Sequence, residues 1–176
     1  MIVLVPLIKA VLVFFVAITV NSLSVYLQKH FRIYDRFGRW GIWLHSLIII
    51  PLWFWFIYQS ANLHGTLWRI PPSIHLIGYF VSLVATTLFV MSIVKLGVSA
   101  LVNGNFFNKG RWAKGKLFQY LHNPMYDSFI LAFIAVGFIR SQWAYFVLAV
   151  ISFIGLNLIQ SSIEKMDSSS PKTTKK

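Results

Sequence analysis

The sequence predicts an all-α, polytopic membrane protein with about five transmembrane helices, and three observations lead to that class. Of the 176 residues, 57% are hydrophobic and only 11% are charged, too few charges to cover the surface of a soluble domain. The apolar residues gather into five long runs. The formal charge of +12 lies mainly in the connections between these runs and in the tail. That placement is typical of a cytoplasmic membrane edge and argues against nucleic-acid binding.

The first apolar run covers residues 6–28 and is too long for a signal peptide, so we expect a retained anchor. At about 1.5 Å per residue it reaches roughly 34 Å, which is enough to cross a bilayer. A basic loop is expected over residues 29–40, and the second span over residues 41–60.

The pair Pro71-Pro72 is a helix-start signal, and we expect the third span to run from there to about residue 94. The next connection, residues 95–121, contains four glycines and five basic residues. This composition predicts re-entrant or interfacial pieces in place of one uninterrupted helix.

The last two spans are expected over residues 124–139 and 142–160. Only Arg140-Ser141 joins them, which predicts a tight antiparallel helical hairpin. We expect a single transmembrane domain over residues 1–164. The remaining residues, 165–176, are predicted to form a disordered, basic cytosolic tail held near anionic lipid headgroups.

The basic residues predict an orientation in the membrane. With five spans, the first loop, the third loop and the tail hold four, five and four of the 16 Lys and Arg residues, all on one side. The positive-inside rule then places the N-terminus outside and the C-terminus in the cytosol. The membrane would be a bacterial inner membrane or that of the endoplasmic reticulum.

One stretch, Gly115 to Tyr126, combines polar, aromatic and conformationally special residues at the mouth of a hydrophobic span. Asn123 is a good N-cap residue, and Pro124 suits the first helical position because its missing N–H costs nothing there. Asp127 falls in the first turn, where the helix dipole favours a carboxylate. Taken alone, these residues predict only the start of a membrane helix.

The same stretch resembles the signature of the isoprenylcysteine carboxyl methyltransferase and phospholipid N-methyltransferase superfamily. In the phospholipid branch, Asn-Pro-Met-Tyr-x-Gly precedes a helical hairpin, and a Glu stands at the cytosolic end of the last span. Here Asn123 to Tyr126 match the motif and Glu164 stands at the expected end. The resemblance covers roughly residues 90–166. It implies methyl transfer from S-adenosylmethionine to a lipophilic acceptor: a phospholipid amine, a prenylcysteine carboxylate or a small hydrophobic thiol.

The resemblance also implies a donor-binding site at the cytosolic end of the last two spans. Aromatic rings would face the adenine or the sulfonium, and the helix start would face the donor's carboxylate. His122 and Glu164 are the catalytic candidates, with His122 the best-placed base for an amine acceptor. The binding candidates are Gly115, Phe118, Tyr120, His122, Asn123, Pro124, Tyr126 and Glu164. No metal site is expected, because the scattered histidines do not share a helix face.

The motif departs from the family pattern at several positions. Leu121 stands near where the carboxyl methyltransferase branch has Arg, and Asp127-Ser128 replaces the x-Gly. Lys165 follows Glu164 where a second Glu often stands. These departures favour an alternative: a catalytically inactive membrane scaffold or partner subunit that retains the fold. Two other functions have less support. A sterol-type reductase would need a nicotinamide site, and the sequence shows no pattern for one. A transporter usually carries charged residues inside its spans, and these spans lack the interior charges that usually mark an ion path. The acceptor and the oligomeric state stay open.

Overall fold

The computed structural model describes residues 4–63, 71–98, 101, 121 and 123–160, and its regular elements are all helices. The elements are α1 (Leu4–Phe31), the 3-10 segment η1 (Ile33–Trp40), α2 (Gly41–Ala61), α3 (Pro72–Leu96), α5 (Pro124–Arg140), α6 (Trp143–Ser152) and the π-helix η4 (Phe153–Gln160). Each of the five predicted spans coincides with a helix, so the all-α class is confirmed.

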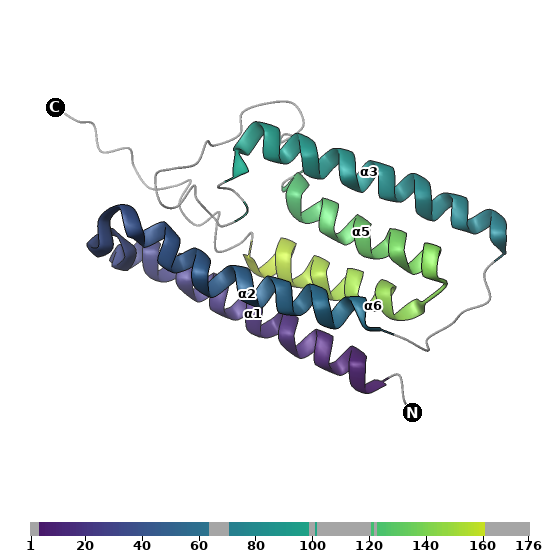
Figure 1. Ribbon diagram of the computed structural model, residues 1–176, viewed down its shortest axis with the longest axis horizontal. Helices are drawn as coiled ribbons and strands as arrows, with labels where there is room; N and C mark the ends of the chain where they lie inside the picture. Colours follow the sequence, from purple (N-terminus) through teal and green to yellow (C-terminus); the bar gives the residue numbers. More distant parts are fainter. Residues whose placement is uncertain (1–3, 64–70, 99–100, 102–120, 122, 161–176) are drawn as a thin grey trace.

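The long helices lie side by side and alternate in direction along the chain (Figure 1). The end of α3, the start of α5 and the end of η4 consequently lie at one end of the bundle, together with η1. Within the described residues, α1, α2 and α3 are long and apolar enough to cross a membrane. The 17 residues of α5 reach only about 25 Å, and α6 with η4 is a shorter apolar helix. The structure thus has the character of a polytopic membrane protein, while full spanning by the last two helices stays a prediction.

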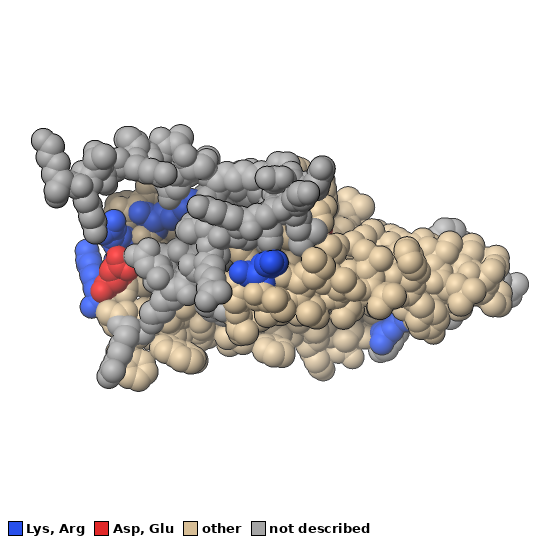
Figure 2. Space-filling model, turned by 90° about the horizontal axis from the view of Figure 1, so that it is seen from above, with Lys and Arg blue, Asp and Glu red and all other residues tan. Residues whose placement is uncertain are grey.

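Charged side chains gather at the end of the bundle that carries η1. Figure 2 shows blue Lys and Arg side chains beside a red acidic one near this end. The last turns of α1 and α3 contribute Lys29 and Lys95, and η1 contributes Asp35. We call this the basic end.

The segment after α1 differs from the loop expected over residues 29–40. The α1 helix continues to Phe31, Arg32 turns the chain with a φ of 48°, and 3-10 turns follow over Ile33–Trp40. These turns meet at a kink at Gly38, whose φ of 54° and ψ of −127° favour glycine. The predicted connection between the first two spans is therefore present but begins later than expected and consists largely of 3-10 turns, which side chains supplied by α1 help to hold.

A buried polar network attaches η1 to α1 and α2. The Gln28 side chain accepts a hydrogen bond from the Tyr34 N–H (3.0 Å) and donates one to Asp35 Oδ1 (2.7 Å). Ser24 Oγ lies 2.6 Å from Tyr34 Oη and 2.8 Å from Nδ1 of the fully buried His45. Buried polar groups are stable only when they are paired, so these bonds hold the segment in one conformation.

The hydrophobic core lies between α1, α2 and α6–η4, and α5 packs against it. Phe14 is fully buried, and its ring centroid lies 5.1 Å from that of Phe56. Phe56 in turn packs edge-on against Phe133 of α5 at 5.6 Å. A Cβ at Gly155 would lie 2.5 Å from Phe14 Cε1, so glycine is what lets η4 approach α1 this closely.

Outside this core, α3 packs against α5 through small residues. The buried residues of α3 are Gly78, Ala85 and Ser92, seven residues apart and therefore on one face. A Cβ at Gly78 would lie 2.8 Å from Ile139 Cγ1 and 2.9 Å from Phe138 Cβ. Small residues are how membrane helices approach closely without a hydrophobic driving force between them.

The predicted hairpin is confirmed, and hydrogen bonds fix it at the end opposite the basic end. Ser141 caps α5 in the left-handed conformation, with a φ of 53°. The Arg140 guanidinium donates to Tyr145 Oη (3.0 Å), which itself donates to the Ser60 carbonyl of α2 (2.9 Å). His75 Nε2 lies 3.0 Å from Ser141 Oγ, which joins the start of α3 to the hairpin.

Candidate functional site

The start of α5 has the geometry that its sequence predicts. Asn123 is the N-cap: its side-chain oxygen accepts from the Tyr126 N–H (3.4 Å), and its carbonyl accepts from the Asp127 N–H (3.0 Å). Pro124 occupies the first helical position and is fully buried. The predicted helix start is confirmed, and it brings three motif residues into one turn.

The carboxylate of Asp127 bridges two helices. Asn157 Nδ2 donates to Asp127 Oδ1 at 3.0 Å, which connects the first turn of α5 to η4. Within the span predicted over residues 142–160, the chain changes from α-helical to π-helical turns after Ser152. Such turns change the direction of following side chains and are frequent at functional sites. Sequence reasoning missed Asn157, although an Asn inside an apolar span is itself a signal, because polar groups there need partners.

Tyr126 and its neighbours are anchored in the protein. Tyr126 is half-buried and packs against the hydrophobic core, so only part of its ring is open to a ligand. Ser128, where the phospholipid branch of the family has Gly, is also buried, and its hydroxyl donates to the Met125 carbonyl at 2.6 Å. The hydroxyl therefore has its hydrogen-bond partner within its own helix, and Ser, like Gly, is a small residue at this position.

The structure tests only part of the predicted donor site. It describes Asn123, Pro124 and Tyr126 and brings them together at the basic end of the bundle. The remaining candidates lie outside the described residues: Gly115, Phe118, Tyr120, His122 and Glu164. Most of the predicted interfacial connection and the whole predicted tail lie outside them as well. Their roles stay predictions. Among the residues that the structure describes, no group of three or more His, Asp or Glu side chains could hold a metal ion.

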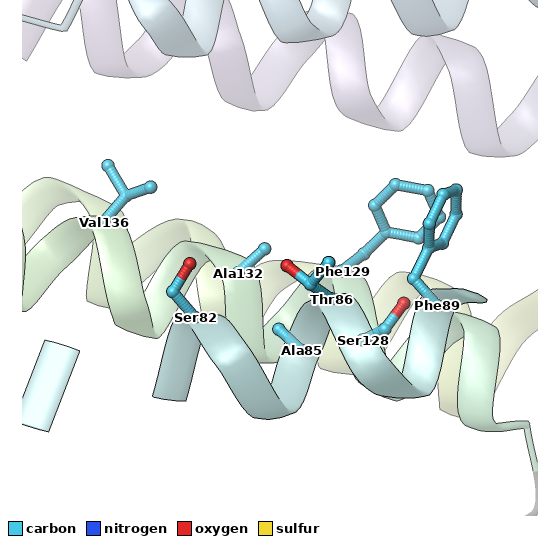
Figure 3. A pocket seen from close by; sticks show the side chains of 8 residues that line it. All are labelled: Ser82, Ala85, Thr86, Phe89, Ser128, Phe129, Ala132 and Val136. Carbon is cyan, nitrogen blue, oxygen red and sulfur yellow. The ribbon is translucent and has the colours of Figure 1, made fainter. Parts of the chain in front are cut away.

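A groove of about 240 Å³ runs between α3 and α5 and begins next to the motif (Figure 3). It starts at Ser128, the residue after Asp127, and extends along both helices away from the basic end. Its lining is mostly apolar and comprises Ser82, Ala85, Thr86, Phe89, Ser128, Phe129, Ala132 and Val136. Thr86, Phe129 and Ala132 are exposed, so the groove opens to the side of the helix pair.

Fold and site together define a helical membrane protein with a polar site at one end of the bundle and an apolar groove leading away from it. The chain belongs to the phospholipid methyltransferase family, whose model matches residues 73–166, just over half of its length. The match spans α3, α5, α6 and η4, includes Glu164, and leaves out α1 and α2. No curated protein and no solved structure matches the chain. Family membership confirms the resemblance seen in the motif and implies methyltransferase activity on lipid substrates.

Proposed function

We propose that this protein transfers a methyl group from S-adenosylmethionine to the amine of a phospholipid headgroup, at the cytosolic face of the membrane. The observation that carries the proposal is the family match, which includes the motif whose first-turn residues meet at the basic end of the bundle. Of the acceptors that the motif leaves open, only an aminophospholipid fits the family's description. Its nitrogen is also the nucleophile that methyl transfer from a sulfonium requires.

The described residues suit the chemistry of the donor. S-adenosylmethionine carries a sulfonium, an ammonium and a carboxylate, so its site must reach water. Asn123, Tyr126 and Asp127 are all partly exposed at the end of the bundle. The Asp127 carboxylate and the Tyr126 ring attract a cation, and the positive end of the α5 dipole attracts the donor's carboxylate. Glu164, four residues beyond the end of η4, is proposed to accept hydrogen bonds from the donor.

The reaction is an in-line displacement. The neutral amine nitrogen attacks the methyl carbon, the carbon–sulfur bond breaks, and sulfur keeps the electron pair as S-adenosylhomocysteine is formed. The acceptor amine must lose a proton to act as the nucleophile, and His122, directly before the helix cap, is the proposed base. Positioning of the two substrates and exclusion of water supply the rest of the acceleration.

Donor binding tests this proposal with full-length protein in phospholipid nanodiscs, using titration calorimetry with S-adenosylmethionine and S-adenosylhomocysteine. Saturable binding is expected for the wild type. Tyr126→Ala and Glu164→Ala should each weaken it about tenfold or more, as expected for the loss of one interaction with a charged group. Trp43→Ala is the control, because this exposed residue of α2 lies outside the family match.

The same titration decides between a methyltransferase and an inactive scaffold. The substituted positions at Leu121, Ser128 and Lys165 favour an inactive scaffold that keeps the family fold. A folded wild-type protein that binds neither ligand at millimolar concentration would contradict the methyltransferase proposal and support the scaffold.

A further inference from the structure

We propose that the groove between α3 and α5 holds one hydrocarbon chain of the lipid acceptor while the acceptor's amine headgroup lies at the motif. The inference rests on the proposed function, because it states where the acceptor's chain lies when its headgroup is at the start of α5. It adds an acceptor-binding surface made of residues that the motif does not contain.

The position of the groove relative to the motif is the first argument. Ser128 directly follows Asp127, and Phe129, Ala132 and Val136 continue the lining along α5. From Ser128 to Val136 the helix rises roughly 12 Å, away from the basic end and along the bundle. A lipid with its headgroup at the first turn of α5 would lay its chain along this path.

The opening of the groove is the second argument. It lies beside α3, a helix long and apolar enough to span a bilayer. Its exposed neighbours on α3 are large and apolar, with Leu83 65% and Val90 51% exposed. The groove therefore opens toward hydrocarbon, and apart from Ser82, Thr86 and Ser128 its lining residues are apolar. An alkyl chain fits these surroundings, whereas a headgroup would lose its hydration there.

The shape of the groove is the third argument. Small residues line it on both helices, Ala85 and Ala132 among them. The rings of Phe89 and Phe129 meet edge-on at 5.6 Å and line the part of the groove nearer the motif. A volume of about 240 Å³ accommodates a segment of one chain, so the second chain of a diacyl lipid would stay in the bilayer.

Photo-cross-linking tests the proposal with full-length protein in phosphatidylcholine nanodiscs. The probe is a phosphatidylethanolamine with a diazirine midway along one chain, present at low mole fraction, and the labelled residues are mapped by mass spectrometry. Labelling at Phe129 and Ala132 should exceed that at Leu83 several-fold, although Leu83 is more exposed. Ala132→Trp, which fills the groove from an exposed position, should remove this enrichment, while the matched control Leu83→Trp should keep it.

A phosphatidylglycerol probe with the same chain separates acceptor binding from ordinary lipid contact, because it has no amine. It should label the groove no more than Leu83. Equal enrichment by both probes, uniform labelling by the ethanolamine probe, or an unchanged pattern in Ala132→Trp would each overturn the proposal. Donor binding measured in the same samples distinguishes failure of the groove proposal from failure of the proposed function. Uniform labelling in protein that binds donor contradicts the groove alone, whereas absent donor binding contradicts the proposed function.

Discussion

At the scale of single residues, the start of α5 serves both the fold and the proposed chemistry. Asn123 and Pro124 were predictable because capping and the proline at the first helical position are local rules. The partner of Asp127 was not, because Asn157 is 30 residues away and faces it only after the chain has turned π-helical. Local sequence patterns therefore predict the backbone conformation of the motif, but they do not predict its hydrogen bonds to residues far away in the sequence.

The Asn123 cap contributes to the stability of the fold, and this contribution can be measured separately from the proposed chemistry. Asn123→Ala removes the acceptor for the Tyr126 N–H and should lower the free energy of unfolding by about 1 kcal/mol. Asn123→Asp should keep most of that stability, since Asp is also a good cap and its charge suits the helix dipole. Thermal unfolding in detergent measures both variants, and equal losses would contradict the capping role.

The bridge between Asp127 and Asn157 should appear as an energetic coupling. Because the acceptor is a carboxylate, the coupling between Asp127→Ala and Asn157→Ala in a double-mutant cycle should be about 1–2 kcal/mol. Unfolding free energies of the wild type, both single variants and the double variant give this value. Strictly additive losses would show that the hydrogen bond does not join α5 to η4 in the membrane.

At the scale of elements, hydropathy located each α-helix that the structure describes, but it did not reveal how the helices pack. An apolar membrane helix presents hydrophobic side chains in all directions, so the sequence did not indicate that α3 would pack against α5 outside the main core. The ordered η1 segment escaped prediction for a related reason. Its backbone is paired by Gln28 of α1, and no local pattern in residues 33–40 shows this.

Close packing of α3 on α5 depends on Gly78. Gly78→Ala brings a methyl group to 2.8 Å from Ile139 Cγ1 and 3.1 Å from the Ala135 carbonyl oxygen, and should cost about 1–3 kcal/mol through overpacking. Leu83→Ala, on the exposed side of α3, should change stability much less. Thermal unfolding in detergent compares the two, and an unaffected Gly78→Ala variant would contradict the packing described here.

At the scale of the whole molecule, charge distribution and helix order together predict the orientation in the membrane. The chain has no cysteine, so a single introduced thiol reports its own position without ambiguity. Arg36→Cys in η1 and Asn62→Cys after α2 mark opposite ends of the bundle, and both positions are exposed. With the protein expressed in a bacterial inner membrane, a membrane-impermeant maleimide applied to intact cells should label the thiol at position 62 and reach that at position 36 only after permeabilisation. The reverse pattern would invert the proposed topology and move the site to the other face.

The most direct test of the central claim is methyl transfer itself. Full-length protein in nanodiscs containing phosphatidylethanolamine would be supplied with S-adenosylmethionine carrying a labelled methyl group, and the lipids analysed by mass spectrometry. The proposed function predicts labelled N-methylated phosphatidylethanolamine and an equal amount of S-adenosylhomocysteine, both reduced in Tyr126→Ala. A folded protein that binds the donor yet transfers no methyl group to this lipid would contradict it.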